Sequence, residues 1–214
     1  GNFNPEGSVN SPEAVASLEY YKELYDCCQP PGMSNAFFAE VNDAMIGGQA
    51  AMGMNYFAFF PALENPELSP YAGNLGYFVN PAGPGGDQFA SLGGQGISVI
   101  NFIDDDRKQA SFDFIKWFGS DEVQKKWGDL GGYSANKAVL GDPAFLEQTP
   151  YNAAFAETMG MVKDFYNIPI FDPLLFAYRD PVAKYVIGGE GTAQEALDEA
   201  AAAQAELLRE AGFL

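Results

Sequence analysis

The sequence predicts an α/β fold with more helix than strand. Several stretches carry apolar residues three or four positions apart, which is the spacing of helices with one buried face. Between them lie a few short apolar runs without alternation, typical of strands buried on both faces. No tandem repeat is visible, so we expect helices packed around a small sheet.

The first helix is predicted to begin at Asn10-Ser11-Pro12-Glu13. Ser11 can cap it and Pro12 suits its first position. Gln29-Pro30-Pro31-Gly32 ends it. The residues predicted on its buried face are Ala14, Leu18, Tyr21 and Tyr25.

A glycine pair and an apolar run follow a second helix, predicted from about residue 35 to 46. Gly47-Gly48 ends that helix, and the run to Met54 predicts a strand buried on both faces. Asn55 comes next with four aromatic residues, Tyr56, Phe57, Phe59 and Phe60. Ligands tend to bind at the carboxyl ends of strands in open α/β sheets, and rings beside an amide suit sugars and polyols. The alternative is that the rings pack beneath a long loop.

Glycine-rich segments mark the middle of the chain. Strands are predicted over residues 75–79 and Ile97–Ile100, with an exposed loop over 80–86. Gly93-Gly94-Gln95-Gly96 precedes a strand instead of a helix, and no Lys-Ser/Thr follows, which excludes a phosphate cradle. A backbone crossing between domains, or a close approach to a ligand, explains these glycines better.

Helices dominate the second half of the sequence. Asp104-Asp105-Asp106 begins a helix that ends at Gly119, since acidic residues favour the N-terminal end of the helix dipole. The spacing of these acids does not match a calcium-binding loop. A short helix is predicted from Ser120 to about Trp127, and the loop over 130–135 presents one aromatic ring and one hydroxyl.

The C-terminal third predicts a turn at Asp142-Pro143 and a helix over residues 152–164. Residues 168–173 predict an extended link into 174–179, and Asp180-Pro181 is predicted to begin a helix that runs to about Ile187. The last helix has the clearest signal, because Thr192-Ala193-Gln194-Glu195 fits a capping box. Gly212 is predicted to end it.

Composition excludes several functional classes. The 214 residues include 47% hydrophobic and 14% aromatic residues, which excludes a disordered tail. Twenty-nine acidic residues against 11 basic ones give a net charge of -18, which repels phosphate backbones and anionic lipid. We therefore expect no nucleic-acid partner and no membrane-surface role. No run approaches the roughly 18 apolar residues of a membrane span.

The chain has no histidine and only two cysteines, Cys27 and Cys28. The commonest general base and the usual serine or cysteine triads are therefore absent. The pair is too small a set of ligands for a metal site, and we expect no cofactor, no metal and no catalytic residue. The two cysteines are free thiols, a rare vicinal disulfide, or partners of cysteines outside this chain, since bridged Cα atoms usually lie about 5.5–6 Å apart.

Taken in order, these segments resemble the extracellular solute-binding proteins of ABC importers, in the family that takes up sugars and oligosaccharides. The resemblance covers nearly the whole chain and rests on the order and spacing of its segments. Those segments are Asn10 to Ala14 with Tyr20-Tyr21-Lys22, Gly47 to Met52, Pro81 to Gly86, Leu92 to Ile97, Phe114 to Phe118, Val123 to Trp127, Gly131 to Ser134 and Gly191 to Asp198.

The resemblance implies an incomplete periplasmic-binding-protein-like fold of two α/β lobes joined by a hinge. Residues 1–92 would form the first segment of the second lobe, 93–145 would contribute to the first lobe, and 146–214 would supply the C-terminal helices of the second lobe. Members of this family are about twice as long as this chain. The N-terminal half and the export signal would then lie upstream, and the protein would act in the periplasm or outside the cell.

The resemblance also implies capture of a sugar or oligosaccharide in the cleft between the lobes, and its delivery to ABC permease subunits in the membrane. The candidate ligand-binding residues are Asn55, Tyr56, Phe57, Gly93, Gly94, Gln95, Tyr133, Ser134, Phe176, Tyr178 and Arg179. Gln95 stands where the family often places an aromatic contact. Arg179 could instead pair with Asp180 or Asp172.

Two other functions remain open at this stage. A carbohydrate-active enzyme would use two carboxylates about 5–10 Å apart, but no pair stands out among the acidic residues. A lectin-like or sensor domain is the other alternative. The sequence does not distinguish a sugar from a polyol or another small polar solute.

Overall fold

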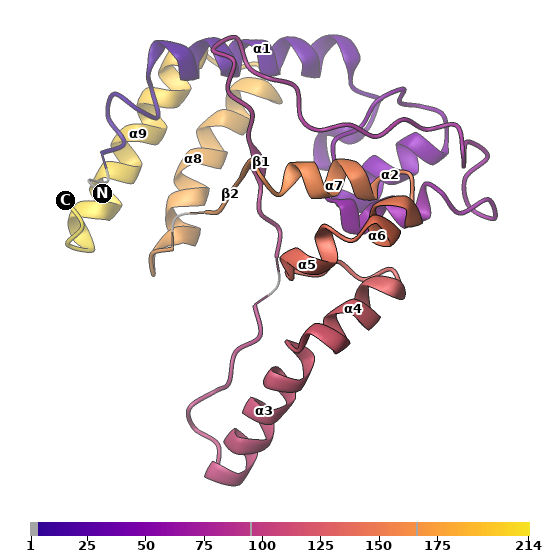
Figure 1. The fold of residues 1–214 in the computed structure, drawn as a ribbon. Helices are drawn as coiled ribbons and strands as arrows, with labels where there is room; N and C mark the ends of the chain where they lie inside the picture. The colour runs from indigo at the N-terminus through magenta and orange to yellow at the C-terminus, as the bar shows by residue number, and fades with distance from the viewer. Residues whose placement is uncertain (1–3, 95, 166) are drawn as a thin grey trace. The chain divides into compact units, whose positions relative to one another are not determined.

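The computed structural model describes residues 4–94, 96–165 and 167–214 (Figure 1). The chain divides into two compact units. Unit 1 takes its described residues from 4–40 and 167–214, and unit 2 comprises Val41–Phe165. These units reflect packing within this chain, and the lobe boundaries stay a prediction. Among the described residues, no helix has both the length and the apolar character that a membrane crossing requires.

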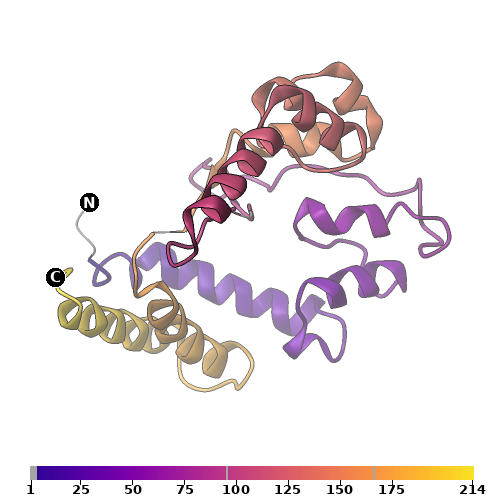
Figure 2. The same cartoon turned by 90° about the horizontal axis from the view of Figure 1, so that it is seen from below.

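Three long helices form unit 1: α1 (Pro12–Cys28), α8 (Phe171–Val186) and α9 (Ala193–Glu210). A short 3₁₀ turn, η1 (Met33–Asn35), follows α1. Figures 1 and 2 show α8 and α9 side by side. Their packing is close because α9 buries a row of small side chains, and the amide of buried Gln204 donates to the carbonyl of Leu174 at 2.9 Å. The core of this unit contains Leu18, Val186, Ala193, Ala196 and Leu197.

The predicted helix starts in unit 1 are confirmed at two places. The Ser11 hydroxyl accepts a hydrogen bond from the N–H of Ala14 at 3.2 Å. Both bonds of the capping box form between Thr192 and Glu195, at 3.2 and 2.9 Å. On the predicted buried face of α1, Leu18 is buried, whereas Tyr21 is 57% exposed and that part of the prediction is wrong.

The predicted helix start at Asp180-Pro181 is wrong, because α8 runs without a break from Phe171 through these residues. Pro181 lies inside the helix and is buried. A proline in a helix interior removes one backbone hydrogen bond, and here the loss is offset by burying its ring together with Leu174 and Val186 on the same helix. The extended link predicted over 168–173 is correspondingly shorter, since α8 begins at Phe171.

Unit 2 is built from short helices and one small ladder. Its helical elements are α2 (Phe38–Ile46), which begins at the end of unit 1, the 3₁₀ helix η2 (Phe57–Ala62), α3 (Asp105–Phe118), α4 (Asp121–Asp129), α5 (Lys137–Leu140), α6 (Pro143–Gln148) and α7 (Asn152–Thr158). Strands β1 (Ala90–Ser91) and β2 (Val162–Lys163) pair in parallel, with Ala90 opposite Val162. Two boundaries differ from the prediction: Asp142-Pro143 begins α6, and the helix predicted over 152–164 ends at Thr158.

The three predicted strands at 49–54, 75–79 and 97–100 do not form. Among the described residues, β1 and β2 make the only ladder. Met52 and Met54, predicted to be buried, are 79% and 78% exposed. A strand exists only when its N–H and C=O groups pair with a neighbouring strand, and no described segment pairs with any of these three.

Of the three alternatives for the two cysteines, the structure shows the vicinal disulfide. Cys27 and Cys28, at the end of α1, form a disulfide with each other, and their Cα atoms lie 3.7 Å apart. Neither is a free thiol.

Adjacent leucines of α8 offer a matched test of the unit 1 core. Leu174 is 2% exposed and Leu175 is 43% exposed. We expect Leu174→Ala to lower the free energy of unfolding by about 2–5 kcal/mol through lost burial and a cavity. Leu175→Ala should cost about 0.5 kcal/mol or less. Urea denaturation followed by circular dichroism measures both, and equal losses would contradict this assignment of the core.

Candidate functional site

The structure places the predicted ligand-binding residues in both units. Unit 2 contains Asn55, Tyr56, Phe57, Gly93, Gly94, Tyr133 and Ser134, and unit 1 contains Phe176, Tyr178 and Arg179. Gln95 lies outside the described residues.

Tyr56 and Gly93 are brought together although 37 positions separate them in the sequence. A methyl group placed on the Cα of Gly93 would collide with Cδ1 and Cε1 of the Tyr56 ring and would lie 3.2 Å from its Cζ. Glycine is therefore needed at position 93 because an aromatic ring approaches the backbone there. The Tyr56 side chain stays partly exposed, as a ring that contacts a solute must be.

Asn55 holds the turn that carries Tyr56. Its amide Nδ2 donates to Oδ1 of Asn42 at 3.1 Å, and its Oδ1 accepts from the N–H of Tyr56 at 2.9 Å. Asn42, on α2, is 6% exposed and donates in turn to the carbonyl of Phe59. This pair of amides therefore fixes residues 55–59 against α2.

Asn42 was not among the residues predicted from the sequence. It lies on α2 between Phe38 and Met45, at positions where helical spacing predicts apolar side chains. A polar residue at a helix position where spacing predicts an apolar side chain could have indicated Asn42.

Phe57 and Tyr133 both belong to an aromatic cluster around Phe155. The Phe57 ring lies 5.3 Å from that of Phe155 and the Tyr133 ring 4.7 Å, both edge to face. The Tyr133 hydroxyl donates to the carbonyl of Phe57 at 2.8 Å. These contacts give both side chains a packing role, and contact with a ligand stays a prediction for them.

Ser134 anchors the loop that carries Tyr133. It is 4% exposed, and its hydroxyl donates to Gln124 at 2.7 Å and accepts from the N–H of Asn136 at 3.0 Å. Gly131, which precedes the loop, has a φ of 89°, which glycine adopts without strain. The Ser134 hydroxyl thus both donates and accepts a hydrogen bond within the protein.

Two tyrosines and a glutamate that the sequence did not single out cluster next to these side chains: Tyr77, Tyr151 and Glu64. The Tyr77 hydroxyl donates to Glu64 at 2.6 Å, and its ring lies 5.4 Å from that of Tyr151. Burial raises the pKa of Tyr77, and the hydrogen bond to Glu64 raises it further. Burial likewise raises the pKa of Tyr133 and of Tyr151. The phenols of Tyr77, Tyr133 and Tyr151 are therefore neutral at physiological pH, and those of Tyr77 and Tyr133 donate hydrogen bonds.

The residues on α8 form a separate exposed group in unit 1. The guanidinium of Arg179 lies 4.5 Å from the centre of the Phe176 ring and 2.8 Å from Oδ1 of Asp180. Of the alternatives for Arg179, the structure shows the pair with Asp180. This pair is well exposed on both sides, so its effect on stability is small. Tyr178 is 38% exposed, and the partial burial of its ring raises its pKa.

This arrangement suits non-covalent recognition better than catalysis. A general acid needs a carboxyl group with a raised pKa, whereas the pKa of Asp142 is lowered by its hydrogen bond with Lys125 and that of Glu40 by backbone N–H groups. Within the described part of the chain, no three His, Cys, Asp or Glu side chains gather where they could hold a metal ion.

Comparison with known families and curated proteins gives a consistent result. The model of the bacterial extracellular solute-binding protein family matches residues 2–185. A probable ABC transporter-binding protein of Deinococcus radiodurans is 30% identical over 152 residues, which cover 69% of this chain and 35% of that protein. A probable amino-acid ABC transporter periplasmic-binding protein of Sinorhizobium fredii is 26% identical over 144 residues, covering 67% of this chain and 32% of that protein.

Solved structures agree in fold. Maltose-bound MalE3 of T. maritima superposes with a TM-score of 0.83 at 24% identity, covering 94% of this chain and 51% of that one. A ribitol complex of an ABC transporter solute-binding protein from Agrobacterium radiobacter K84 gives 0.77 at 27% identity, with the same two coverages. This chain spans about half the length of these structures and about a third of the curated relatives. The predicted two-lobe α/β fold class is confirmed.

The contact between Tyr56 and Gly93 predicts that a single methyl group is not tolerated there. Gly93→Ala should lower the free energy of unfolding by about 1–3 kcal/mol, since the ring must move. Gly94→Ala is the matched control, because nothing lies within 4 Å of an added methyl group. Chemical denaturation measures both variants. Equal stabilities would show that the ring does not rest on Gly93 in solution.

Alkaline pH should destabilise the protein through its buried phenols. Folding raises the pKa of Tyr133, so the folded state keeps a proton that the unfolded chain loses near about pH 10. The resulting stability is complete below that pH and falls as the pH rises above it. Denaturant melts over about pH 8–11 should show a flatter decline for Tyr133→Phe than for the unmodified protein. Tyr20→Phe, at a 61% exposed position, should leave the decline unchanged, and a decline unaffected by Tyr133→Phe would contradict the assignment.

Proposed function

Because the chain belongs to the bacterial extracellular solute-binding family, we propose that it acts in the substrate-binding component of an ABC importer and captures a sugar or a polyol. The observation that carries this proposal is the partly exposed Tyr56 ring, fixed over Gly93 and held by the amides of Asn55 and Asn42. A ring held in this way presents a preorganised apolar face, and sugars and polyols expose C–H groups that pack on such faces.

The relatives support this solute class over an amino acid. Two solved neighbours are described with maltose and with ribitol, and a third, an ABC substrate-binding protein from Listeria monocytogenes, with cycloalternan at a TM-score of 0.64. The Sinorhizobium relative is named as an amino-acid binder, which makes amino acids the second candidate. Arginine is a common partner for the carboxylate of an amino acid, and Arg179, the arginine among the candidate residues, is already paired with Asp180.

Within this proposal the candidate residues divide into three groups. Tyr56 stacks on the solute, and Gly93 and Gly94 allow the backbone to approach it. Gln95, the next residue in the sequence, stays a predicted contact. Asn55, Phe57, Tyr133 and Ser134 position the loops that carry the stacking ring, through the contacts described above. Phe176, Tyr178 and Arg179 offer a second aromatic surface on α8.

Capture of the solute by this component would then proceed without covalent chemistry. The solute binds the closed arrangement of the two-lobe architecture more tightly than the open one and shifts the population toward it. The closed form delivers its cargo to membrane permease subunits, outside the cytoplasmic membrane. The family description names a binding protein and no reaction, in agreement with the predicted absence of catalysis. No cofactor is required.

The direct test is isothermal titration of the protein with maltose, ribitol and a mixture of amino acids in separate experiments. We expect saturable heat with at least one of the first two and none with the amino acids. Heat with the amino acids alone would reject a sugar or polyol and favour an amino acid as the solute. No heat with any of them, at protein concentrations suited to millimolar affinity, would overturn it.

The stacking role of Tyr56 makes a separate prediction. Tyr56→Ala should weaken solute binding about 2- to 10-fold, the loss expected for one aromatic contact, while the fold is kept. Tyr20→Ala, at an exposed position on α1, is the control and should bind like the unmodified protein. Titration calorimetry and circular dichroism on each variant provide the readouts. A Tyr56→Ala protein that folds and binds normally would remove Tyr56 from the site.

A further inference from the structure

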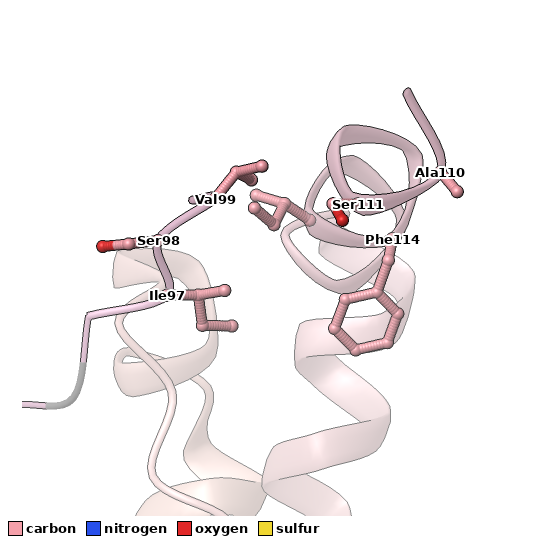
Figure 3. Close-up of a pocket in the computed structure, with 7 residues that line it drawn as sticks. Ile97, Ser98, Val99, Ala110, Ser111 and Phe114 are labelled. Atoms are coloured by element: carbon pink, nitrogen blue, oxygen red, sulfur yellow. The ribbon is translucent and has the colours of Figure 1, made fainter. Parts of the chain in front are cut away.

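The depression beside α3 carries little chemistry of its own. Figure 3 shows it between Ile97 and Val99 on one side and Phe114 of α3 on the other, and its volume is about 350 Å³. The described side chains that line it are apolar apart from the hydroxyls of Ser98 and Ser111. The reactive group that solute binding leaves unexplained lies in unit 1, at the end of α1.

The disulfide between Cys27 and Cys28 joins the last two residues of α1, with no residue between its ends. In the chain-entropy account a disulfide stabilises a fold by closing a loop, and the effect shrinks as the loop shortens. The core of unit 1 is built from other residues. This bridge therefore holds no distant segments together, and its role is better sought in its reactivity.

Both cysteines of the bridge are exposed. Exchange requires a thiolate to approach one of the two sulfurs, so exposed disulfides are labile whereas buried structural ones resist reduction. The family is described as extracellular, and disulfides form and persist outside the cytoplasm. The bridge can therefore persist there and still react with small thiols.

Negative charge lies next to the exposed sulfurs. Glu23 stands four positions before Cys27, and side chains at this spacing are neighbours on a helix, with Cβ atoms about 5–6 Å apart. Glu23 is exposed and, among the described residues, forms no ion pair. The last turn of α1 contains no basic residue, so the negative end of the helix dipole is not offset either.

The cations in this part of unit 1 are already paired. Lys22 on α1 lies 3.1 Å from a carboxylate oxygen of Asp26, and its Nζ donates to the carbonyl of Val186 at 3.3 Å. On α8, Lys184 pairs with Glu199 at 3.3 Å. Neither lysine offsets the unpaired carboxylate next to the disulfide, so the sulfurs lie in a negative local field.

We propose that the Cys27–Cys28 disulfide is an exchange site for small thiols, which reacts with cationic and uncharged thiols and disfavours anionic ones. A thiol with a positive group is attracted to the carboxylate of Glu23 and to the helix end, and a thiol with an added negative group is repelled. The site is separate from the candidate solute site, and its reaction does not depend on the identity of the solute.

The reaction is a two-electron reduction of the bridge by two thiols. The first thiol attacks as a thiolate, bonds to one cysteine sulfur and displaces the other, which takes up the proton that the thiol released. The second thiol attacks the resulting mixed disulfide and frees the second cysteine in the same way. One protein disulfide and two small thiols thus give two cysteine thiols and one small disulfide, and the small thiols supply both electrons.

The test exposes the 214-residue protein to cysteamine, β-mercaptoethanol and β-mercaptopropionate, which are cationic, uncharged and anionic. Mass spectrometry after acid quenching follows the mixed disulfide, and each rate is divided by that thiol's rate with hydroxyethyl disulfide, which is uncharged. At about 0.1 M salt the normalised rate should be at least about threefold higher for cysteamine than for β-mercaptopropionate. At about 1 M salt, where the Debye length falls to about 3 Å, this ratio should approach one.

A matched pair of variants locates the charge. Glu23→Gln should lower the ratio of the two rates at least about twofold at about 0.1 M salt. Glu13→Gln makes the same change in charge on the same helix, but about 21 Å along the axis from Cys27 and beyond the Debye length of about 10 Å. It should leave the ratio unchanged. Circular dichroism checks that both variants are folded.

Four results would overturn the proposal. The normalised rates of the cationic and anionic thiols could be equal at about 0.1 M salt, both variants could lower the ratio alike, or the folded protein could react with none of the thiols. The fourth result concerns the double variant Cys27→Ser/Cys28→Ser, which should keep the urea midpoint of the unmodified protein. A lower midpoint would make the bridge a structural cross-link. No solute is added, so these results are independent of the proposed function.

Discussion

Unit 2 depends on the edge-to-face packing of aromatic rings around Phe155. Phe57, Tyr133 and Phe145 approach this ring from three other segments, at centroid distances of 5.3, 4.7 and 6.3 Å. Each such pair stabilises by about 0.5–1.5 kcal/mol beyond the burial of its area. The ladder in this unit is only two residues long on each strand, so ring packing, more than sheet pairing, joins the loops at 55–62 and 131–134 to α6 and α7.

This cluster supports the loops that carry the candidate site. The backbone of Phe57 accepts the Tyr133 hydroxyl, and the neighbouring Tyr56 ring rests on Gly93. Phe57 and Tyr133 thus hold the loops, and Tyr56 is the ring that we propose to face the solute. The phenols of Tyr77 and Tyr133 are half-buried, neutral and hydrogen-bonded, which suits recognition of uncharged polar groups better than proton transfer.

Helix ends could be predicted from the sequence because their signals are local. Ser11 and the Thr192–Glu195 box lie within four residues of the N–H groups they cap, and both predictions are confirmed. Strands could not be predicted in this way, because Ile97–Ile100 requires a partner that its own sequence does not contain. Pro181 misled the prediction of α8, since tertiary burial outweighed its local preference.

Only part of the candidate site could be predicted from the sequence, again because its contacts join segments that are distant in the chain. The aromatic run at 56–60 and the glycines at 93–94 indicated two loops, and the structure joins Tyr56 to Gly93. The amide pair of Asn42 and Asn55 and the bond from Tyr77 to Glu64 link positions 13 residues apart. No spacing rule connects such positions, so these contacts emerge only from the folded chain.

The most direct measurement is ligand-observed saturation-transfer NMR with the protein and either maltose or ribitol, with spectra repeated over a day. If Tyr56 stacks on the solute, transfer reaches the C–H protons of at least one solute and is lost in Tyr56→Ala. The ligand spectrum then does not change with time. Transfer that persists in a folded Tyr56→Ala protein would contradict the stacking site. New resonances from a product would contradict binding without chemistry.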